Sequence, residues 1–467
     1  MRQRRCESDG RIGGSHRRRH MSSDRHIAVI GGGITGLAAA HSLIDQGAQV
    51  TLFEAGDRLG GMIRTTPFAG HPAIDEGPDA FLARVPWAGD LARKVSLGDS
   101  LTSPALGQAA VWWNGLHDIP TGLLLGMPTD LFGVARSRLL SRRGKVRAAM
   151  EVMRPRTETA SDSIGKYVRA RFGDEVHERL VDPLIGSIYA ADTDDFSLVA
   201  VPQLAELAER SRSVLLAARR NPAPTATGPV FYAPTAGIGA LVDAVAAVVG
   251  ARGGDLRCGA PVSQLAADGT QWRVDGEPFD VVVLACPART TAALLTSVEP
   301  SAAATLAAIP AADVALLTLA LPTDGWPDRL RKLSGYLVPK PRQRLVTAVS
   351  FGSQKWAHWA EPGQMILRVS LGRDGLSALH LSDDELLADA LDELNLHLQF
   401  DAQPTAVRIS RWAGAFPQYR PHHGATIAAA ERSLPSGLAL AGASYHGIGI
   451  PACIRSAQQA AAAVLMR

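Results

Sequence analysis

Hydrophobic and polar residues over 26–54 follow the spacing of a strand, a tight turn, a helix and a second strand. An apolar run at 27–30 stops at the sequence GGGITG (31–36), and Ala and Leu then recur at helical spacing up to residue 44. A second apolar run at 49–53 ends at Glu54. The pattern predicts a β-α-β unit, and with it an α/β domain built on a parallel sheet.

The glycine-rich turn has the features of a dinucleotide-binding loop. Gly31 permits the turn, Gly33 lets the backbone approach a pyrophosphate, and Gly36 lets the helix pack close to the strand. The N-terminus of the helix offers N–H groups and partial positive charge to phosphates. The carboxylate of Glu54 can accept hydrogen bonds from both ribose hydroxyls of an adenosine. We predict dinucleotide binding; the alternative is a glycine-rich turn that serves packing alone.

Elsewhere the pattern predicts helices followed by a second, antiparallel sheet. Helical spacing over 164–172 follows N-cap candidates at 161–163. A capping box from Ser382 to Glu385 begins another helix. The apolar segment 119–128 is broken by Pro and Gly, which suits a lid or channel lining. Alternating segments that indicate antiparallel strands occur at 316–321, 345–351 and 365–371.

The C-terminal stretch predicts a second helix that begins behind glycines. A short strand at 438–440 is followed by Gly447–Pro451 and then by a helix of mainly small residues over 452–465. Such a helix N-terminus can approach a flat ring and stabilise negative charge at its edge. A reduced flavin carries that charge near N1 and the C2 carbonyl. The alternative is an ordinary buried helix whose small residues reflect tight packing.

Charge and cysteine content narrow the functional classes. The formal charge is +3, but residues 1–20 hold seven Arg against two acids, so the rest of the chain has a slight negative balance and no nucleic-acid signature. We interpret residues 1–20 as a disordered basic tail or as an extension upstream of a start at Met21. No apolar run approaches the roughly 18 residues that span a bilayer, so we expect at most peripheral membrane contact. The four Cys have no metal-binding spacing, so we predict no metal site and a cytoplasmic location.

Several segments together resemble the FAD-dependent porphyrinogen oxidases of haem synthesis, with the bacterial coproporphyrinogen III oxidases most alike. The resemblance runs from His26 to the C-terminus in the same order. The first and last motifs are shared with amine oxidases and carotenoid desaturases. The segments are GGGITGLAAA with Glu54-Ala55, 57–61, 76–82, LVDPLIGSIYA at 180–190, Arg411-Trp412 with FPQY at 416–419, and GASYHGIGIPACI at 442–454.

The resemblance implies an FAD-binding Rossmann-like domain of the p-hydroxybenzoate-hydroxylase type, an antiparallel-sheet substrate domain and a helical domain. A chain of 467 residues is long enough for two or three domains. We expect the FAD-binding domain in three pieces, 21–100, 228–305 and 408–467. The helical or substrate-channel domain is expected at 101–227 and the antiparallel substrate domain at 306–407.

The resemblance also implies a set of cofactor-binding residues, with the pyrophosphate at the first glycines and the ribose at Glu54. The expected set is Gly31, Gly32, Gly33, Ile34, Thr35, Gly36, Glu54, Ala55, Arg58, Gly61, Gly77, Pro78, Asp79, Ala80, Val262, Trp412, Ile448, Gly449 and Ile450.

The implied reaction is oxidation of coproporphyrinogen III to coproporphyrin III, with oxygen as acceptor and hydrogen peroxide as the second product. The substrate's propionates need cations, and Arg84 and Arg64 are our candidates, although either can be a solvated surface arginine. Asp79 is a candidate for polarising a pyrrole N–H near the flavin, or it only caps a turn.

Other activities stay open at this point. Protoporphyrinogen IX is an alternative substrate, and an amine oxidase, a carotenoid desaturase or a non-catalytic porphyrin carrier is more distant. Contact with other enzymes of the haem pathway is conceivable.

Overall fold

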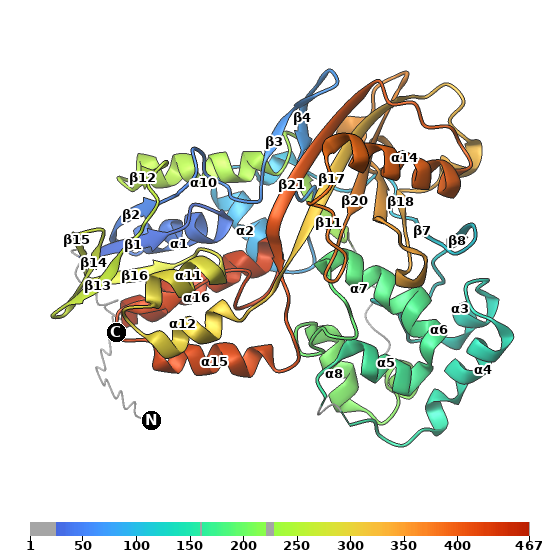
Figure 1. The fold of residues 1–467 in the computed structure, drawn as a ribbon, viewed down its shortest axis with the longest axis horizontal. Helices are drawn as coiled ribbons and strands as arrows, with labels where there is room; N and C mark the ends of the chain where they lie inside the picture. Colours follow the sequence, from blue (N-terminus) through green and yellow to red (C-terminus); the bar gives the residue numbers. More distant parts are fainter. Residues whose placement is uncertain (1–24, 159–160, 221–227, 467) are drawn as a thin grey trace, which may run out of the picture.

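The computed structural model describes residues 25–158, 161–220 and 228–466. Figure 1 shows three regions: a parallel sheet flanked by helices, a long twisted antiparallel sheet, and a group of helices beside that sheet. We call them the parallel unit, the antiparallel unit and the helical unit. The predicted basic tail, residues 1–20, lies outside the described residues, as do 221–227 at the end of the segment predicted to be helical.

The parallel unit is built on five strands in the order β12-β2-β1-β16-β22. All neighbours pair in parallel, with Ile27 beside Val281 and His26 beside Gln49. Both faces of such a sheet are covered, which explains the continuous apolar runs. The strands are β1 (His26–Ile30), β2 (Gln49–Phe53), β12 (Asp255–Arg257), β16 (Val281–Leu284) and β22 (Leu438–Leu440).

Alternate residues of each strand face opposite sides of this sheet. Ile27 and Val29 pack with one set of helices, whereas Ala28 and Ile30 pack with another. The first set is α1 (Ile34–Ile44), α2 (Pro86–Lys94), α10 (Gly239–Ala251) and α16 (Ile450–Met466). The second is α11 (Ala288–Leu295), α12 (Pro300–Ala307) and α15 (His423–Ser433), together with the strands β13 (Leu265–Asp268), β14 (Gln271–Val274) and β15 (Glu277–Phe279).

The antiparallel unit is a sheet of seven strands in the order β21-β17-β20-β19-β18-β7-β8. Its pairs are antiparallel except for β18 with β7. The helix α14 (Asp383–Leu398) covers one face, and its N-terminus has the predicted capping box of Ser382 and Glu385. The strands are β7 (Ala109–Trp112), β8 (Leu116–Asp118), β17 (Ala311–Pro322), β18 (Gly335–Leu337), β19 (Val346–Phe351), β20 (Gln364–Leu371) and β21 (Ala406–Pro417).

This sheet extends beyond the segment 306–407 that the sequence indicated. β21 pairs with β17 from Ala406 to Pro417, with a register shift after Trp412, so the strand runs through the expected boundary at 408. β7 and β8 come from the segment 101–227, where we expected helices and a channel. Backbone pairing across more than 200 residues adds them to the sheet edge, and a local pattern carries no such signal. The residues 119–128 form the short strands β9 (Leu123–Leu124) and β10 (Met127–Pro128).

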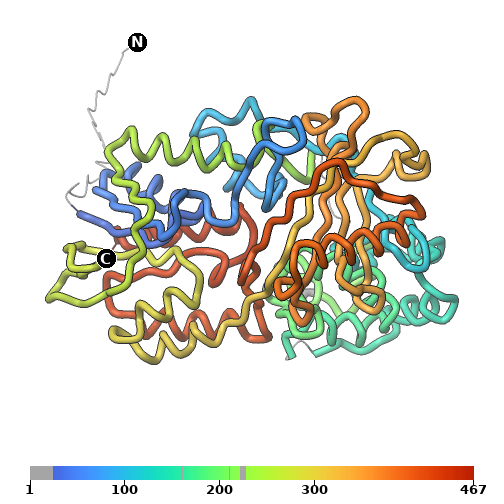
Figure 2. Tube along the Cα trace, turned by 45° about the horizontal axis from the view of Figure 1, so that its top comes forward, coloured from blue at the N-terminus to red at the C-terminus, as the bar shows by residue number. Residues whose placement is uncertain are grey.

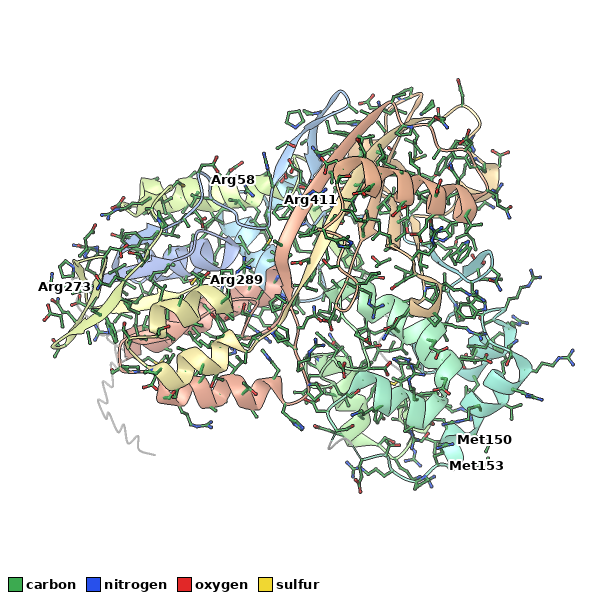
Figure 3. The ribbon with its side chains drawn as sticks, viewed as in Figure 1. Arg58, Met150, Met153, Arg273, Arg289 and Arg411 are labelled. Carbon is green, nitrogen blue, oxygen red and sulfur yellow. The ribbon has the colours of Figure 1, made fainter. Side chains whose placement is uncertain are left out.

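The helical unit has its own buried core. Ser163 caps α5 through a hydrogen bond from Lys166 N–H, and Gly173 ends it with φ +92°, as predicted. Met150 and Met153 lie at the far end of this unit, away from the parallel sheet (Figure 3). Among the described residues, no helix combines the length and the apolar character needed to cross a membrane. The elements are α3 (Leu131–Arg136), α4 (Arg142–Ala149), α5 (Ile164–Phe172), α6 (Asp174–Val176), the π-turn His177–Val181, α7 (Asp182–Tyr189), α8 (Pro202–Arg210) and α9 (Val214–Arg220).

Candidate functional site

The glycines at the start of α1 are required by close backbone contacts. Gly31 has φ +110°, and a Cβ there would lie 2.8 Å from Ala285 O. A Cβ on Gly36 would lie 1.8 Å from Gly31 O. Gly33, in contrast, occupies the N-cap position with open space where a Cβ would point. The turn and the close packing are therefore present as predicted. We call the open region beside Gly33, at the start of α1, the cradle.

A second glycine loop, 57–63, closes one side of this cradle. Gly60 N–H donates to Gly32 O at 2.9 Å, and a Cβ on Gly61 would lie 3.3 Å from Gly33 Cα. Arg58 (Figure 3) donates to the carbonyl oxygens of Gly61 at 2.8 Å and Ile63 at 2.9 Å. Its guanidinium thus fixes the shape of the loop by binding its carbonyl oxygens, a role that the sequence did not indicate.

The carboxylate of Glu54 is anchored beside the same loop. It accepts hydrogen bonds from Gly32 N–H at 2.7 Å and Gly56 N–H at 2.8 Å. Gly259 N–H donates to Gly56 O at 2.6 Å, which places the segment of Val262 next to Glu54 and Ala55. Because each carboxylate oxygen has two lone pairs, Glu54 keeps acceptor capacity for hydroxyl groups.

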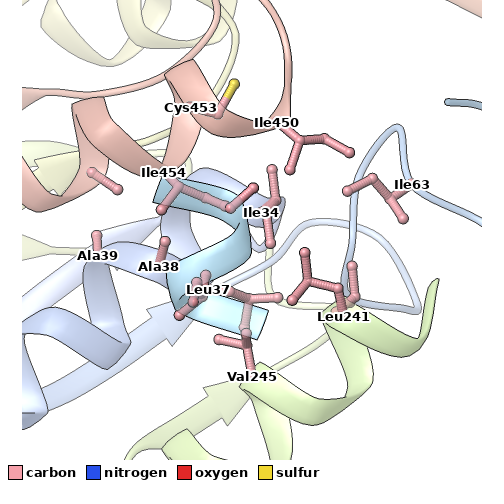
Figure 4. Packing of buried hydrophobic residues seen from close by; sticks show 14 of the residues in the cluster. Ile34, Leu37, Ala38, Ala39, Ile63, Leu241, Val245, Ile450, Cys453 and Ile454 are labelled. Atoms are coloured by element: carbon pink, nitrogen blue, oxygen red, sulfur yellow. The ribbon is translucent and has the colours of Figure 1, made fainter. Parts of the chain in front are cut away.

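The start of α16 lies against the start of α1. Figure 4 shows Ile34 beside Ile450, with Cys453 and Ile454 packed along the same seam. A Cβ on Gly442, which precedes α16, would lie 3.3 Å from the Thr35 hydroxyl. Figure 2 shows the red C-terminal helix beside the blue N-terminal segment. Gly449 has φ +104° and, like Gly33, open space where a Cβ would point.

The loop 76–80, after β4 (His71–Asp75), joins the cradle to the antiparallel unit. A Cβ on Gly77 would lie 2.2 Å from Met62 O, so the loop touches the second glycine loop. Trp412 Nε1 of β21 donates to Glu76 O at 3.0 Å, and Arg368 of β20 donates to Gly77 O. Pro78 and Ala80 are half-buried in this loop. Gly77 and Trp412, predicted from distant motifs, are therefore neighbours.

Asp79 of this loop is held by two hydrogen-bond donors and by an ion pair with Arg368. Lys355 Nζ lies 2.9 Å from its carboxylate, Trp356 Nε1 3.1 Å and Arg368 3.3 Å. Burial alone would raise the pKa of Asp79, but the charges of Lys355 and Arg368 outweigh burial and hold that pKa well below its ordinary value. At neutral pH the carboxylate is thus a fixed anion and a poor base. These contacts give Asp79 a role in holding the loop, and its polarising of a pyrrole N–H stays a prediction.

The two arginines predicted for the propionates have different surroundings. Arg64 lies 3.3 Å from the Glu76 carboxylate and is half-exposed. Arg84 is exposed and lies between β5 (Phe81–Leu82) and α2. The sequence did not single out Lys355 and Arg368, because Lys355 follows an apolar strand and Arg368 interrupts one. Their contacts in the loop 76–80 are 276 or more residues away along the chain.

The arrangement fits an extended dinucleotide with a flat ring. Two helix starts with exposed backbone offer N–H groups and positive dipole ends to one region. Residues with a side chain at Gly33 or Gly449 would fill that region. Within the described residues, no three His, Cys, Asp or Glu side chains are placed to hold a metal ion.

Nearly the whole chain is similar to known proteins. A coproporphyrinogen III oxidase from Bacillus subtilis (strain 168) is 31% identical over 456 residues, covering 92% of this chain and 96% of that protein. The protoporphyrinogen oxidase of Homo sapiens is 28% identical over 479 residues, covering 94% of this chain and 98% of that protein.

A solved structure from Exiguobacterium sp. 255-15, provisionally named protoporphyrinogen oxidase, has a TM-score of 0.83 at 30% identity, covering 96% of this chain and 100% of that chain. This agreement confirms the predicted α/β fold with an antiparallel sheet. Residues 34–465 match the family described as flavin containing amine oxidoreductase. The chain belongs to the flavin-containing amine oxidoreductase family.

Proposed function

We propose that this protein is an FAD-dependent oxidase that converts coproporphyrinogen III to coproporphyrin III, with oxygen as acceptor and hydrogen peroxide as product. The observation that carries the proposal is the similarity to a coproporphyrinogen III oxidase along 92% of the chain. The convergence of the two glycine-bearing helix starts supports the cofactor. Protoporphyrinogen IX is the second candidate substrate, because the human relative bears that name.

The chain offers FAD a site along its length. Within Gly31–Gly36, the backbone N–H groups from Gly33 onward would hold the pyrophosphate, and Glu54 would accept from the adenosine ribose. Ile448–Ile450 at the start of α16 would face the pyrimidine edge of the ring. Gly61 and Gly77, from the loops 57–63 and 76–80, and Trp412 of β21 would enclose the ring. When bound, the flavin supplies a hydride acceptor at N5.

The overall oxidation removes three hydrides from bridging methylenes and three protons from the porphyrinogen. Three molecules of oxygen take up these six electrons and six protons as hydrogen peroxide. The protein has to place a methylene C–H over the ring and exclude water. The Lys355 and Arg368 contacts to Asp79 support this task, because they fix the loop 76–80. We propose that Arg84 binds a propionate, and that Arg64, already paired with Glu76, contributes less.

A comparison of rates tests the substrate. Purified protein loaded with FAD is incubated with coproporphyrinogen III and with protoporphyrinogen IX, and porphyrin fluorescence is followed. We expect the higher kcat/KM with coproporphyrinogen III. A higher value with protoporphyrinogen IX would reverse the assignment. Turnover of amines or phytoene, but of neither porphyrinogen, would replace it with another activity of the scaffold.

We propose a cytoplasmic protein that makes at most peripheral membrane contact and that can meet other enzymes of the haem pathway. The described Cys258, Cys286 and Cys453 are free thiols, which supports a reducing compartment. Fractionation of cells into cytosol and membranes, with and without a high-salt wash, tests this placement.

A further inference from the structure

Tyr419 lies where the three units meet, directly after β21. Its ring lies between Phe196 of the helical unit, with centroids 6.1 Å apart and planes at 9°, and His423 of α15, at 3.8 Å and 12°. Tyr189 extends the stack, 5.2 Å from Phe196. Ser197 N–H donates to Tyr419 O at 2.7 Å. Burial lowers the pKa of His423 to about 4, so a neutral imidazole completes the stack.

The hydroxyl of Tyr419 reaches across to the 442–449 loop, which leads into α16. It donates to Ala443 O at 2.5 Å and accepts from Gly447 N–H at 2.8 Å. Tyr419 is 5% exposed, and burial raises its pKa, so the hydroxyl keeps its proton. Both hydrogen-bonding roles are therefore fixed. One oxygen atom bridges two points of the loop and sets its curvature.

This loop needs such an anchor because glycines dominate its end. Gly447 has φ +117° and Gly449 has φ +104°, conformations that glycine adopts without a fixed preference. Other contacts hold the first half of the loop. Gly442 N–H donates to Ser456 Oγ at 3.0 Å, and Tyr445 donates to Thr291 at 2.8 Å. The Tyr419 hydroxyl extends this support to Gly447, two residues before Gly449.

We propose that Tyr419 is a positioning residue that holds the start of α16 against the flavin and thereby sets flavin affinity and reduction potential. The inference rests on the proposed place of the flavin at Ile448–Ile450. A helix N-terminus stabilises negative charge, which the reduced flavin carries near its pyrimidine edge. A loosened loop therefore weakens binding of the reduced form more than binding of the oxidised form.

The variant Tyr419→Phe tests the inference, since it removes the hydroxyl and keeps the ring stack. Apoprotein is titrated with FAD by the quenching of flavin fluorescence, and the midpoint potential of the loaded protein is measured with a reference dye. We expect the Kd for oxidised FAD to rise about tenfold. We expect the affinity for reduced FAD to fall a further tenfold. The midpoint potential is then lower by ~30 mV for a two-electron couple.

Tyr336→Phe is the matched control. Tyr336 is equally buried, in the core of the antiparallel unit, and its hydroxyl lies 3.2 Å from His397 Nδ1. This change should lower thermal stability but leave the FAD Kd and the potential unchanged. A Tyr419→Phe protein that binds FAD with wild-type Kd and potential would overturn the inference, as would equal shifts in both variants.

Phe196→Leu serves if Tyr419→Phe does not fold. It keeps the hydroxyl but removes one side of the stack, and we expect the Kd for FAD to rise about threefold. An unchanged Kd would also overturn the inference. A wild-type protein that binds FAD but oxidises neither porphyrinogen would refute the proposed function alone, because the Tyr419 readouts need no porphyrinogen.

Discussion

The starts of α1 and α16 and the loop 76–80 around Asp79 border the same cradle. They differ in the contacts that hold them in place. The helix starts present backbone and glycine, and the contacts at Gly31 and Gly36 leave no room for a Cβ. The loop 76–80 is fastened by side-chain charges from β20 and from the segment after β19. The first region should therefore be sensitive to added volume and insensitive to pH, whereas the second should depend on pH through the charge of Asp79.

The largest effect is expected from added volume at Gly36. The Cβ of Gly36→Val would lie 1.8 Å from Gly31 O, so the turn and the helix have to separate. We expect purified Gly36→Val to contain no bound flavin, measured as the ratio of flavin to protein absorbance. The control is Gly250→Val in α10, where a Cβ meets open space. Equal flavin content in both variants would contradict the packing argument.

Removal of the charge at Asp79 should destabilise the protein while the packing of the glycines at the helix starts stays unchanged. In Asp79→Asn, Lys355 and Arg368 lose their buried partner, which costs about 3 kcal/mol of unfolding free energy at pH 7. Because the pKa of Asp79 is lowered in the folded state, this stabilisation is present above the unfolded pKa and is lost as pH falls. Urea denaturation at several pH values should show the difference from wild type shrinking below about pH 4.

The exposed pair of Asp328 and Arg331 provides the control for this experiment. Asp328 is 93% exposed, so Asp328→Asn should leave the unfolding free energy within experimental error at every pH. A pH-independent difference for Asp79→Asn would show that its charge is not the source of its effect.

Asp75 should give a smaller, oppositely directed pH effect. Burial raises its pKa to about 6, although Thr65, Arg368 and Ile238 N–H each favour the charged form. The stability it contributes is present below the unfolded pKa near 4 and is lost as pH rises through about 6. We expect Asp75→Asn to remove roughly 2 kcal/mol of the wild-type decline in unfolding free energy between pH 4 and pH 7. If Asp75→Asn showed the same decline as wild type, another group would be its cause.

The smallest effect is expected from substitutions of the exposed arginines Arg84 and Arg64. Arg84→Ala should raise the KM for coproporphyrinogen III about tenfold, the value of one charged hydrogen bond, with flavin content unchanged. Arg64→Ala should raise it less, because Arg64 is already paired with Glu76. Steady-state kinetics by porphyrin fluorescence distinguish them. Unchanged KM in both variants would remove both arginines from the substrate site.

The parallel unit could be predicted from the sequence because its signals are local. The turn at Gly31–Gly36 and the strand ending at Glu54 each occupy a few consecutive residues, as does the capping box at Ser382 in the antiparallel unit. The contacts of Asp79 could not be predicted, since Lys355 is 276 residues away. Likewise, the pairing of β7 with β18 and the reach of Tyr419 to Gly447 depend on tertiary packing. No spacing rule along the chain encodes them.

The assembly of the parallel sheet from distant segments also constrains how the protein is made. β1 and α1 are synthesised first, but their neighbours β16, β22 and α16 follow at residues 281, 438 and 450. A nascent chain that has not yet passed residue 450 lacks one wall of the cradle. The complete cradle therefore exists only after this segment has been translated.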